Sequence, residues 1–193
     1  MRLGVLTEPE GENRVAIVPN SVKKLAKSGF EVVVESGAGR LAGHSDAEYE
    51  SIGAAVVTRD EAIAAPLIIA IALPDVNELT AGQTVACVAD PFRNPEVVRD
   101  CLGAGITLLS MDMIPRRLSR AQSMDVNSSQ DNLAGYKAVL LGASHVSKSI
   151  PMMTTSAGTV RPAKFVIMGS GVAGLHAIAT AKPGPYTHPT PPT

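Results

Sequence analysis

Three glycines near the carboxyl end of the sequence have the spacing that a phosphate-binding turn requires. Gly169, Gly171 and Gly174 form the pattern G-x-G-x-x-G between an apolar run, AKFVIMG, and an alanine-rich stretch. In such a turn the first glycine makes the tight bend, the second lets the backbone approach a pyrophosphate, and the third lets helix pack on strand. Glycine-rich turns also serve packing alone, but a position between a predicted strand and a predicted helix favours dinucleotide binding.

The acidic residue that usually follows this pattern is missing. It is expected about 20 positions later, where it would bind the adenosine ribose. The sequence there reads THPTPPT, and no Asp or Glu follows Asp131, although five Lys or Arg residues do. Residues 183–193, PGPYTHPTPPT, are rich in proline and poor in apolar side chains. We therefore expect this tail to be disordered.

A second group of polar residues lies in the stretch PRRLSRAQSMDVNSSQ, where one predicted domain meets the next. One interpretation is a solvated helix start, with Asp125 facing the positive end of the helix dipole. The other is a ligand site, because clefts between domains are common binding sites. Arg14, in EGENRVAIVP, leaves the same two alternatives: a loop charge or an anion contact.

The sequence gives little support for a metal-binding site or for a catalytic nucleophile. The four histidines are scattered without the spacing of metal ligands, so we predict no metal site. Cys87 and Cys101 each lie among apolar residues, which predicts buried, reduced thiols. No nucleophile has a recognisable base beside it, and no pair of carboxylates has a persuasive spacing.

Short apolar runs alternate with amphipathic stretches along the first two thirds of the chain. We predict strands at RLGVLTE, EVVVESG, AAVV, LIIAIA, TVACVA and ITLLS, and helices at PNSVKKLAKSGF, SDAEYESIGA and NPEVVRDCLGAG. Ser45 and Glu48 form a capping-box pattern at the start of the second helix. This rhythm predicts an α/β protein with a doubly wound parallel sheet.

The first domain is expected over residues 1–122. One long helix over 125–146 then leads into a second domain, with Leu133, Tyr136 and Leu140 on one face. A loop over 147–162 and a strand at AKFVIMG follow. Residues 123–182 thus contain the linking helix and the first strand and helix of a second, nucleotide-binding Rossmann domain.

Charge and hydropathy give no support for binding to nucleic acid or to a membrane. The formal net charge is −1, which gives no reason to expect nucleic acid or an anionic membrane surface. The start, MRLGVLTEPEGENR, has no apolar signal segment. The longest apolar run, AIAAPLIIAIALP, is short and broken by proline, so we expect no transmembrane segment.

Three stretches resemble one known family. EGENRVAIVPNSVKKLAKSGFEVVVESGAG, RAQSMDVNSSQDNLAGYKAV and GTVRPAKFVIMGSGVAGLHAIATAK are similar to the NAD(H)-binding component, alpha subunit domain I, of proton-translocating NAD(P) transhydrogenases. The resemblance covers residues 1 to about 182, and RAQSMD is typical of that family. It implies hydride transfer between NAD(H) here and NADP(H) on a partner component, coupled to proton movement across a membrane.

The resemblance also implies roles for the polar group. In the family these residues surround the nicotinamide, with Arg117 and Asp125 orienting each other, Gln122 reaching toward NADP(H), and Ser128 binding the carboxamide. These four are the expected catalytic residues. The expected NAD-binding residues are the three glycines of the turn together with Arg117 and Ser128. The family further implies a homodimer that is peripheral on the cytoplasmic face of the membrane and docks an NADP(H)-binding component and a membrane component.

Two alternatives stay open. Alanine dehydrogenases share this pattern, but they place a lysine and a histidine against a keto acid in stretches that align with IAIALP and VACVADPF, and neither residue is present here. The departure from the family at Lys182 leads us to expect a C-terminally truncated member that is inactive alone. The second alternative is that the chain is a non-catalytic remnant that acts as a dimerising module.

Overall fold

The computed structural model describes residues 1–182 and divides the chain into two compact units. The first unit spans Met1–Met124, and the second begins at Asp125. Each unit has its own backbone packing. The predicted disordered tail, 183–193, lies outside the described residues.

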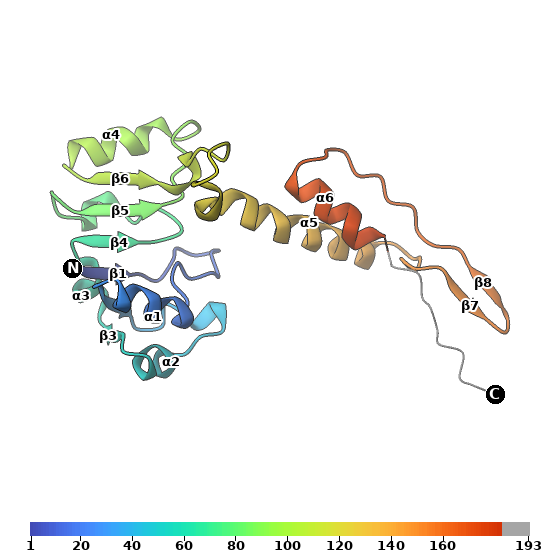
Figure 1. Cartoon of the computed structure of the whole chain (residues 1–193), viewed down its shortest axis with the longest axis horizontal. Coiled ribbons are helices and arrows are strands. Elements are labelled where there is room, and N and C mark those ends of the chain that lie inside the picture. The colour runs from blue at the N-terminus through green and yellow to red at the C-terminus, as the bar shows by residue number, and fades with distance from the viewer. Residues whose placement is uncertain (183–193) are drawn as a thin grey trace. The chain divides into compact units, whose positions relative to one another are not determined.

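The first unit is built on a sheet of six strands that are all parallel. Their order is β3-β2-β1-β4-β5-β6, so the chain winds outward from β1 in one direction and then, from β4, in the other (Figure 1). This arrangement confirms the predicted doubly wound α/β fold. The strands are β1 (Arg2–Val5), β2 (Glu31–Glu35), β3 (Ala55–Val57), β4 (Leu67–Ile69), β5 (Thr84–Cys87) and β6 (Thr107–Ser110).

Four helices connect these strands, and they pack against two separate apolar clusters. The helices are α1 (Pro19–Lys27), α2 (Asp46–Ser51), α3 (Arg59–Ile63) and α4 (Pro95–Gly103). One cluster contains Val22 of α1 and Tyr49 of α2, and the other contains Ala62 of α3 and Cys101 of α4. Cys87 is also buried in the second cluster, so the prediction that both thiols are buried is confirmed.

Capping boxes begin two of the helices. In α2 the Ser45 hydroxyl accepts from the Glu48 N–H, while the Glu48 side chain accepts from the Ser45 N–H, which confirms the predicted box. The sequence TRDE forms a second box, between Thr58 and Glu61, at the start of α3. Each box satisfies backbone N–H groups that the first helical turn would otherwise leave unpaired.

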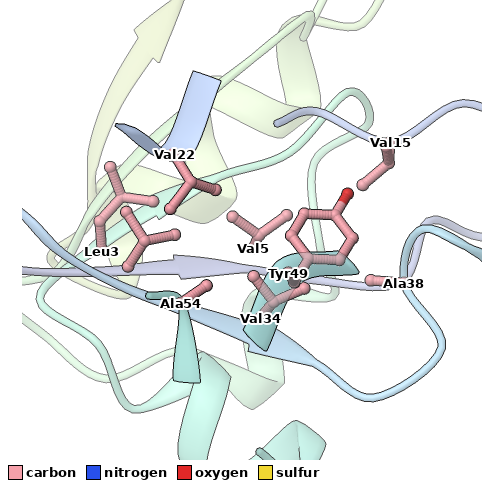
Figure 2. Packing of buried hydrophobic residues seen from close by; sticks show 9 residues of the cluster. Leu3, Val5, Val15, Val22, Val34, Ala38, Tyr49 and Ala54 are labelled. Atoms are coloured by element: carbon pink, nitrogen blue, oxygen red, sulfur yellow. The ribbon is translucent and has the colours of Figure 1, made fainter. Parts of the chain in front are cut away.

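Tyr49 is the largest fully buried side chain of the first unit's core (Figure 2). Its ring packs among Leu3, Val5 and Val34, and its hydroxyl donates to the Ile17 carbonyl at 2.8 Å. The hydrogen bond meets the requirement that a buried phenol has a polar partner. It also attaches the loop before α1 to the core.

Gly4 lies in the central strand with no space for a side chain. A Cβ at this position would collide with the Ala62 carbonyl oxygen and lie 3.2 Å from the Ala65 Cβ. The backbone of α3 therefore rests directly on β1. Where two backbones approach this closely, only a glycine fits, because any other residue would bring a Cβ into the contact.

The described part of the second unit contains two helices and two strands. Helix α5 (Val126–His145) is followed by a hairpin of β7 (Met153–Thr155) and β8 (Gly158–Val160), and then by α6 (Val172–Ala181). The hairpin corrects the prediction of a loop over 147–162. Two residues, Ser156 and Ala157, make its turn, with the Ala157 N–H donating to the Thr155 hydroxyl.

The predicted strand at AKFVIMG is wrong for the described chain, since 161–170 form no helix or strand. Val166 and Met168 are 86% and 94% exposed. A strand needs a neighbour to bond its N–H and carbonyl groups, and no described strand pairs with this segment. The apolar run shows that these residues suit a strand, but it does not show whether a neighbouring strand is present to pair with them.

The face of α5 that carries the predicted row of large residues is not the buried face. Leu133, Tyr136 and Leu140 are exposed, whereas Gly135 and Val139 are buried. Gly135 meets the Ala173 carbonyl of α6 so closely that a Cβ would collide with it. Small residues let the two helices approach, so the contact face follows side-chain size rather than hydropathy.

Gly4→Ala should lower the free energy of unfolding by about 1–3 kcal/mol, because the new methyl group must push α3 away from β1. Chemical denaturation followed by circular dichroism measures the loss. Gly103→Ala is the matched control, because nothing lies within 4 Å of its Cβ position, and it should leave stability equal or slightly higher. Equal stability of Gly4→Ala and the natural chain would contradict the packing of α3 on β1.

Candidate functional site

The glycine turn that precedes α6 has three positions with three different environments. Gly169 has a φ of 113°, which a residue with a side chain rarely adopts. Gly171 has open space around its Cβ position. At Gly174 a Cβ would collide with the Gly169 carbonyl oxygen. The turn therefore needs Gly169 for its bend and Gly174 for its close packing. At Gly171 the missing side chain leaves room beside the backbone.

Helix α6 begins at this turn without a side-chain cap. Gly171 is the N-cap residue and offers no side chain, and the first helical bond runs from the Leu175 N–H to the Gly171 carbonyl at 2.9 Å. The N–H groups of the first turn point out of the helix end, where they and the helix dipole attract an anion. A phosphate ester has the charge and the acceptors that fit this end.

Asp125 and Ser128 are brought together at the start of α5. The Asp125 carboxylate accepts from the Ser128 N–H at 2.9 Å and from the Ser128 hydroxyl at 2.6 Å. Asp125 is thus the N-cap of α5, as expected for an acidic residue at the positive end of a helix. The hydroxyl of Ser128 thus donates its proton to Asp125, and a hydroxyl oxygen can in addition accept a hydrogen bond.

Arg117 and Gln122 belong to the first unit, in a series of turns that follows β6. The Ala121 N–H donates to the Leu118 carbonyl, and the Met124 N–H donates to the Ala121 carbonyl, each at 2.9 Å. Arg117 is exposed within these turns, and Gln122 begins a short 3-10 helix, Gln122–Met124. The roles expected for these two residues and the pairing of Arg117 with Asp125 stay predictions.

A cavity of about 350 Å³ lies in the first unit where β1 and β4 end. Residues that follow β1 form one wall, and residues that follow β4 form another. The winding direction reverses between these two strands, and the carboxyl end of a parallel sheet at such a point is a common ligand site. Sequence reasoning missed this cavity, although a doubly wound parallel sheet, which was predicted, has such a reversal point and so was a signal for it.

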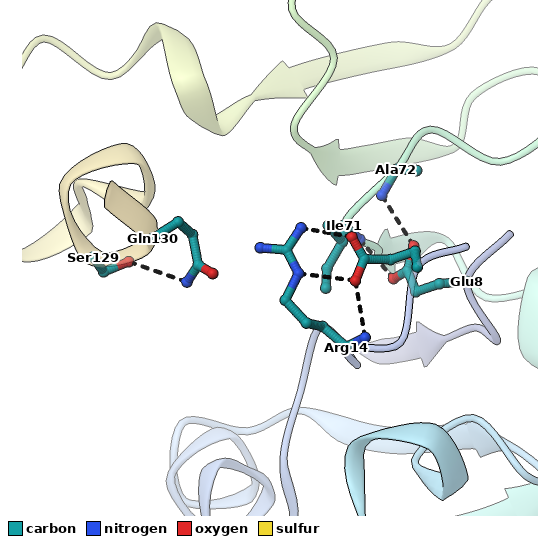
Figure 3. Close-up of polar contacts among 7 residues, drawn as sticks. Glu8, Arg14, Ile71, Ala72, Ser129 and Gln130 are labelled. Atoms are coloured by element: carbon teal, nitrogen blue, oxygen red, sulfur yellow. Dashed lines mark hydrogen bonds and ion pairs between the residues drawn. The ribbon is translucent and has the colours of Figure 1, made fainter. Parts of the chain in front are cut away.

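Glu8 joins the two walls of this cavity (Figure 3). Its carboxylate accepts from the Ile71 N–H at 2.6 Å and from the Ala72 N–H at 3.0 Å. Burial raises the pKa of Glu8 above its ordinary value of 4.5, and the two backbone bonds oppose this rise. The residue therefore connects segments that lie more than sixty positions apart in the sequence.

Arg14 is paired with Glu12 in the loop after Glu8. The Arg14 backbone N–H and Nε both donate to Glu12 Oε1 at 2.9 Å, and Nη2 donates to Oε2 at 2.6 Å. The Arg14 guanidinium holds the pKa of Glu12 below its ordinary value. These contacts give Arg14 a fixed partner, and an additional anion contact stays an open alternative.

The cavity is strongly acidic. Arg59 bridges Glu35 at 3.1 Å and Glu78 at 2.6 Å, and both carboxylates line the cavity. Four carboxylates and this one guanidinium are the charged side chains of the lining: Glu8, Glu35, Asp75, Glu78 and Arg59. An excess of negative charge makes the cavity unfavourable for an anionic ligand.

Neither a metal cluster nor a membrane span is found in the part of the chain that the structure describes. No group of three or more His, Cys, Asp or Glu side chains within residues 1–182 is placed to hold a metal ion. Within the same residues, no helix has both the length and the apolar composition that crossing a bilayer requires.

Comparison with known proteins gives matches along nearly the whole sequence. Residues 4–134 match the family "Alanine dehydrogenase/PNT, N-terminal domain", and residues 138–183 match "Alanine dehydrogenase/PNT, C-terminal domain". The first portion of the NAD(P) transhydrogenase alpha subunit of Rhodospirillum rubrum is 43% identical over 182 residues, which are 89% of this chain and 47% of that protein. The chain thus spans about half the length of this curated relative.

Two solved structures have the same fold. A transhydrogenase from Sinorhizobium meliloti superposes with a TM-score of 0.89 at 45% identity, over 94% of this chain and 53% of that one. An L-alanine dehydrogenase superposes with a TM-score of 0.81 at 25% identity, over 94% of this chain and 52% of that one. Of these two structures, the transhydrogenase is the more similar in both sequence and backbone.

The raised pKa of Glu8 predicts how stability depends on pH. The folded chain holds the Glu8 proton more tightly than the unfolded chain, so this stabilising contribution is complete below about pH 4.5 and is lost as pH rises through the raised pKa. The stability of the natural chain relative to Glu8→Gln should therefore fall as pH rises from 4.5 toward 7. Denaturant titrations of both proteins over this range measure the difference.

Glu61→Gln is the control with the opposite sign. The Thr58 backbone N–H lowers the pKa of Glu61, so its contribution is present above its ordinary value of 4.5 and is lost as pH falls through the lowered pKa. The natural chain should therefore gain stability relative to Glu61→Gln as pH rises. The same slope for both variants would contradict the burial of Glu8.

Proposed function

The chain belongs to the alanine dehydrogenase/PNT family, and we propose that it is the NAD(H)-binding part of a proton-translocating NAD(P) transhydrogenase. Nicotinamide nucleotide binding is common to the family's named relatives, and NAD(H) as the nucleotide of this chain is the proposal. The observation that carries it is the turn at Gly169, Gly171 and Gly174, which leads into an uncapped helix end.

The geometry of this turn supports binding of the dinucleotide pyrophosphate. A diphosphate placed at the end of α6 would accept hydrogen bonds from its first N–H groups. The open space at Gly171 lets a phosphate approach the backbone, and the packed Gly174 keeps the helix end close to the bend. A turn that served only packing would have no need for open space at Gly171.

The acidic cavity argues against keto-acid chemistry. A keto acid needs a cation for its carboxylate and a proton donor for its carbonyl. The stretch IAIALP instead offers the Ile71 and Ala72 N–H groups, and Glu8 already occupies both. A second carboxylate placed beside Glu8 would be repelled. This difference favours the transhydrogenase over the alanine dehydrogenase alternative.

Hydride transfer between two nicotinamides needs no acid or base at the reacting carbons. It needs two rings held in contact and kept away from water, which is positioning rather than proton transfer. Ser128, with its proton donated to Asp125, would accept from the carboxamide N–H₂ and so orient the nicotinamide. Gln122 would reach toward the NADP(H) of a partner component, and Arg117 and Asp125 would orient each other beside the nicotinamide.

The whole enzyme would contain more than this chain. We propose a homodimer that docks an NADP(H)-binding component and a membrane component on the cytoplasmic face, where proton movement is coupled to hydride transfer. The ribose-binding acid expected after the glycine turn is not found in the sequence, since no Asp or Glu follows Asp131. We therefore expect the chain alone to be inactive.

NADH should bind the purified chain only in the millimolar range, because pyrophosphate contacts act without the acidic ribose contact. Titration followed by NADH fluorescence measures the affinity. Gly171→Ala should weaken binding further without a change in thermal midpoint, since its φ of −73° suits any residue and its Cβ has free space.

Gly174→Ala is the companion variant, and it should lose both binding and stability because its methyl group meets the Gly169 carbonyl. Equal NADH affinity for Gly171→Ala and the natural chain would contradict pyrophosphate binding at this turn. A saturable site in the low micromolar range would instead contradict the weak affinity and indicate that a second chain completes the pocket.

A chimera tests the reaction. Residues 1–182 would replace the matching portion of the Rhodospirillum rubrum relative, with that protein's own remaining sequence after them. Together with the relative's partner components, this chimera should reduce an NAD analogue with NADPH and show no alanine-dependent NAD reduction. Alanine turnover by the chimera would overturn the assignment in favour of alanine dehydrogenase.

A further inference from the structure

Asn132 carries a buried polar atom without a partner. Its side-chain oxygen, Oδ1, is buried within α5 and accepts no hydrogen bond from any described residue. Buried amide oxygens nearly always have a donor, because leaving one unpaired opposes folding. A donor from outside the chain would remove this penalty, so the position of Asn132 shows where such a donor must lie.

Asn132 lies on the face of α5 that packs against α6. Gly135 and Val139 are the buried residues of this helix, and they follow Asn132 by three and seven positions, which puts all three on one face. Gly135 meets the Ala173 carbonyl in the first turn of α6. Asn132 therefore lies one helical turn from the point where α6 begins.

The segment before α6 brings the glycine turn beside the same part of α5. The Phe165 ring lies 3.8 Å from the Cβ position of Gly142, and α6 begins beside Gly135. Seven residues of α5 separate these two contacts, about 10 Å of helix, and the four residues from Phe165 to Gly169 span about 13 Å when extended. The turn therefore lies beside the part of α5 that contains Gly135 and Asn132. Figure 1 shows α6 alongside α5.

The chemistry of the missing donor follows from this position. A pyrophosphate at the end of α6 carries acceptors but no donor at neutral pH, so it cannot bond Oδ1. The groups next to it in a dinucleotide are riboses, and each ribose hydroxyl is a donor. A neutral amide suits this place better than a carboxylate, which the phosphates would repel.

We propose that Asn132 positions the dinucleotide by accepting a hydrogen bond from one of its ribose hydroxyls. This inference rests on the proposed binding of a dinucleotide at the glycine turn. Asn132 acts beside Ser128, which precedes it by four residues on the same helix and whose hydroxyl donates to Asp125. The two residues give α5 a row of acceptors that meets the sugar and the carboxamide.

The test compares Asn132→Leu with the natural chain, using ADP-ribose and inorganic pyrophosphate as probes. Leucine has a similar size and no acceptor. Amide NMR titrations detect millimolar binding, and the Gly169 and Gly171 signals report on the turn. We expect a dissociation constant for ADP-ribose that is raised about three- to tenfold, unchanged affinity for pyrophosphate, and an equal or higher thermal midpoint without ligand. Gln130→Leu, at an exposed amide on the same helix, should change neither affinity.

Each other result has a definite meaning. Unchanged ADP-ribose affinity would overturn the role of Asn132, as would an equal loss for both probes, which would place its effect on the turn itself. A lower thermal midpoint of Asn132→Leu would show that Asn132 is structural. If the natural chain binds neither probe and the glycine signals do not move, the proposed function fails first and this inference fails with it.

Discussion

Direct contact of backbone with backbone is the constraint on which this structure depends. At Gly4 the central strand β1 meets the Ala62 carbonyl, so α3 lies against the sheet without a layer of side chains between them. The contact lies within α3, whose start is capped by Thr58 and Glu61. Arg59, the first residue of α3, bridges two carboxylates that line the cavity at the carboxyl edge of the sheet. The helix that packs directly on β1 thus also supplies a side chain to the cavity wall.

The second unit uses the same device twice. Gly135 brings α5 onto the first turn of α6, and Gly174 brings α6 onto the bend at Gly169. Because both contacts lie at the start of α6, they hold the helix end in place where its N–H groups are uncapped. A rigid, open helix end is an anion site whose donors need no rearrangement when the ligand arrives.

Charge separates the two candidate sites. The cavity of the first unit has four carboxylates around one guanidinium, whereas the α6 turn, GSGVAG, has no charged side chain. An anionic substrate is disfavoured at the first and favoured at the second. The cavity is therefore a poor site for a keto acid, whereas the α6 turn suits the phosphates of a dinucleotide.

The sequence by itself determined the elements whose signals are local. Alternating apolar runs predicted the six strands of the parallel sheet, and Ser45 with Glu48 predicted a helix start, because strand and cap formation depend on neighbouring residues. The glycine spacing likewise predicted the turn before α6. Only the tertiary structure decided which face of α5 is buried, since that depends on the size of Gly135 against Ala173. It also decided that AKFVIMG forms no strand in the described chain, because a strand exists only with a partner to bond it. The Glu8 contact with Ile71 and Ala72 had no local signal at all, since it joins residues that come together only when β1 and β4 pair.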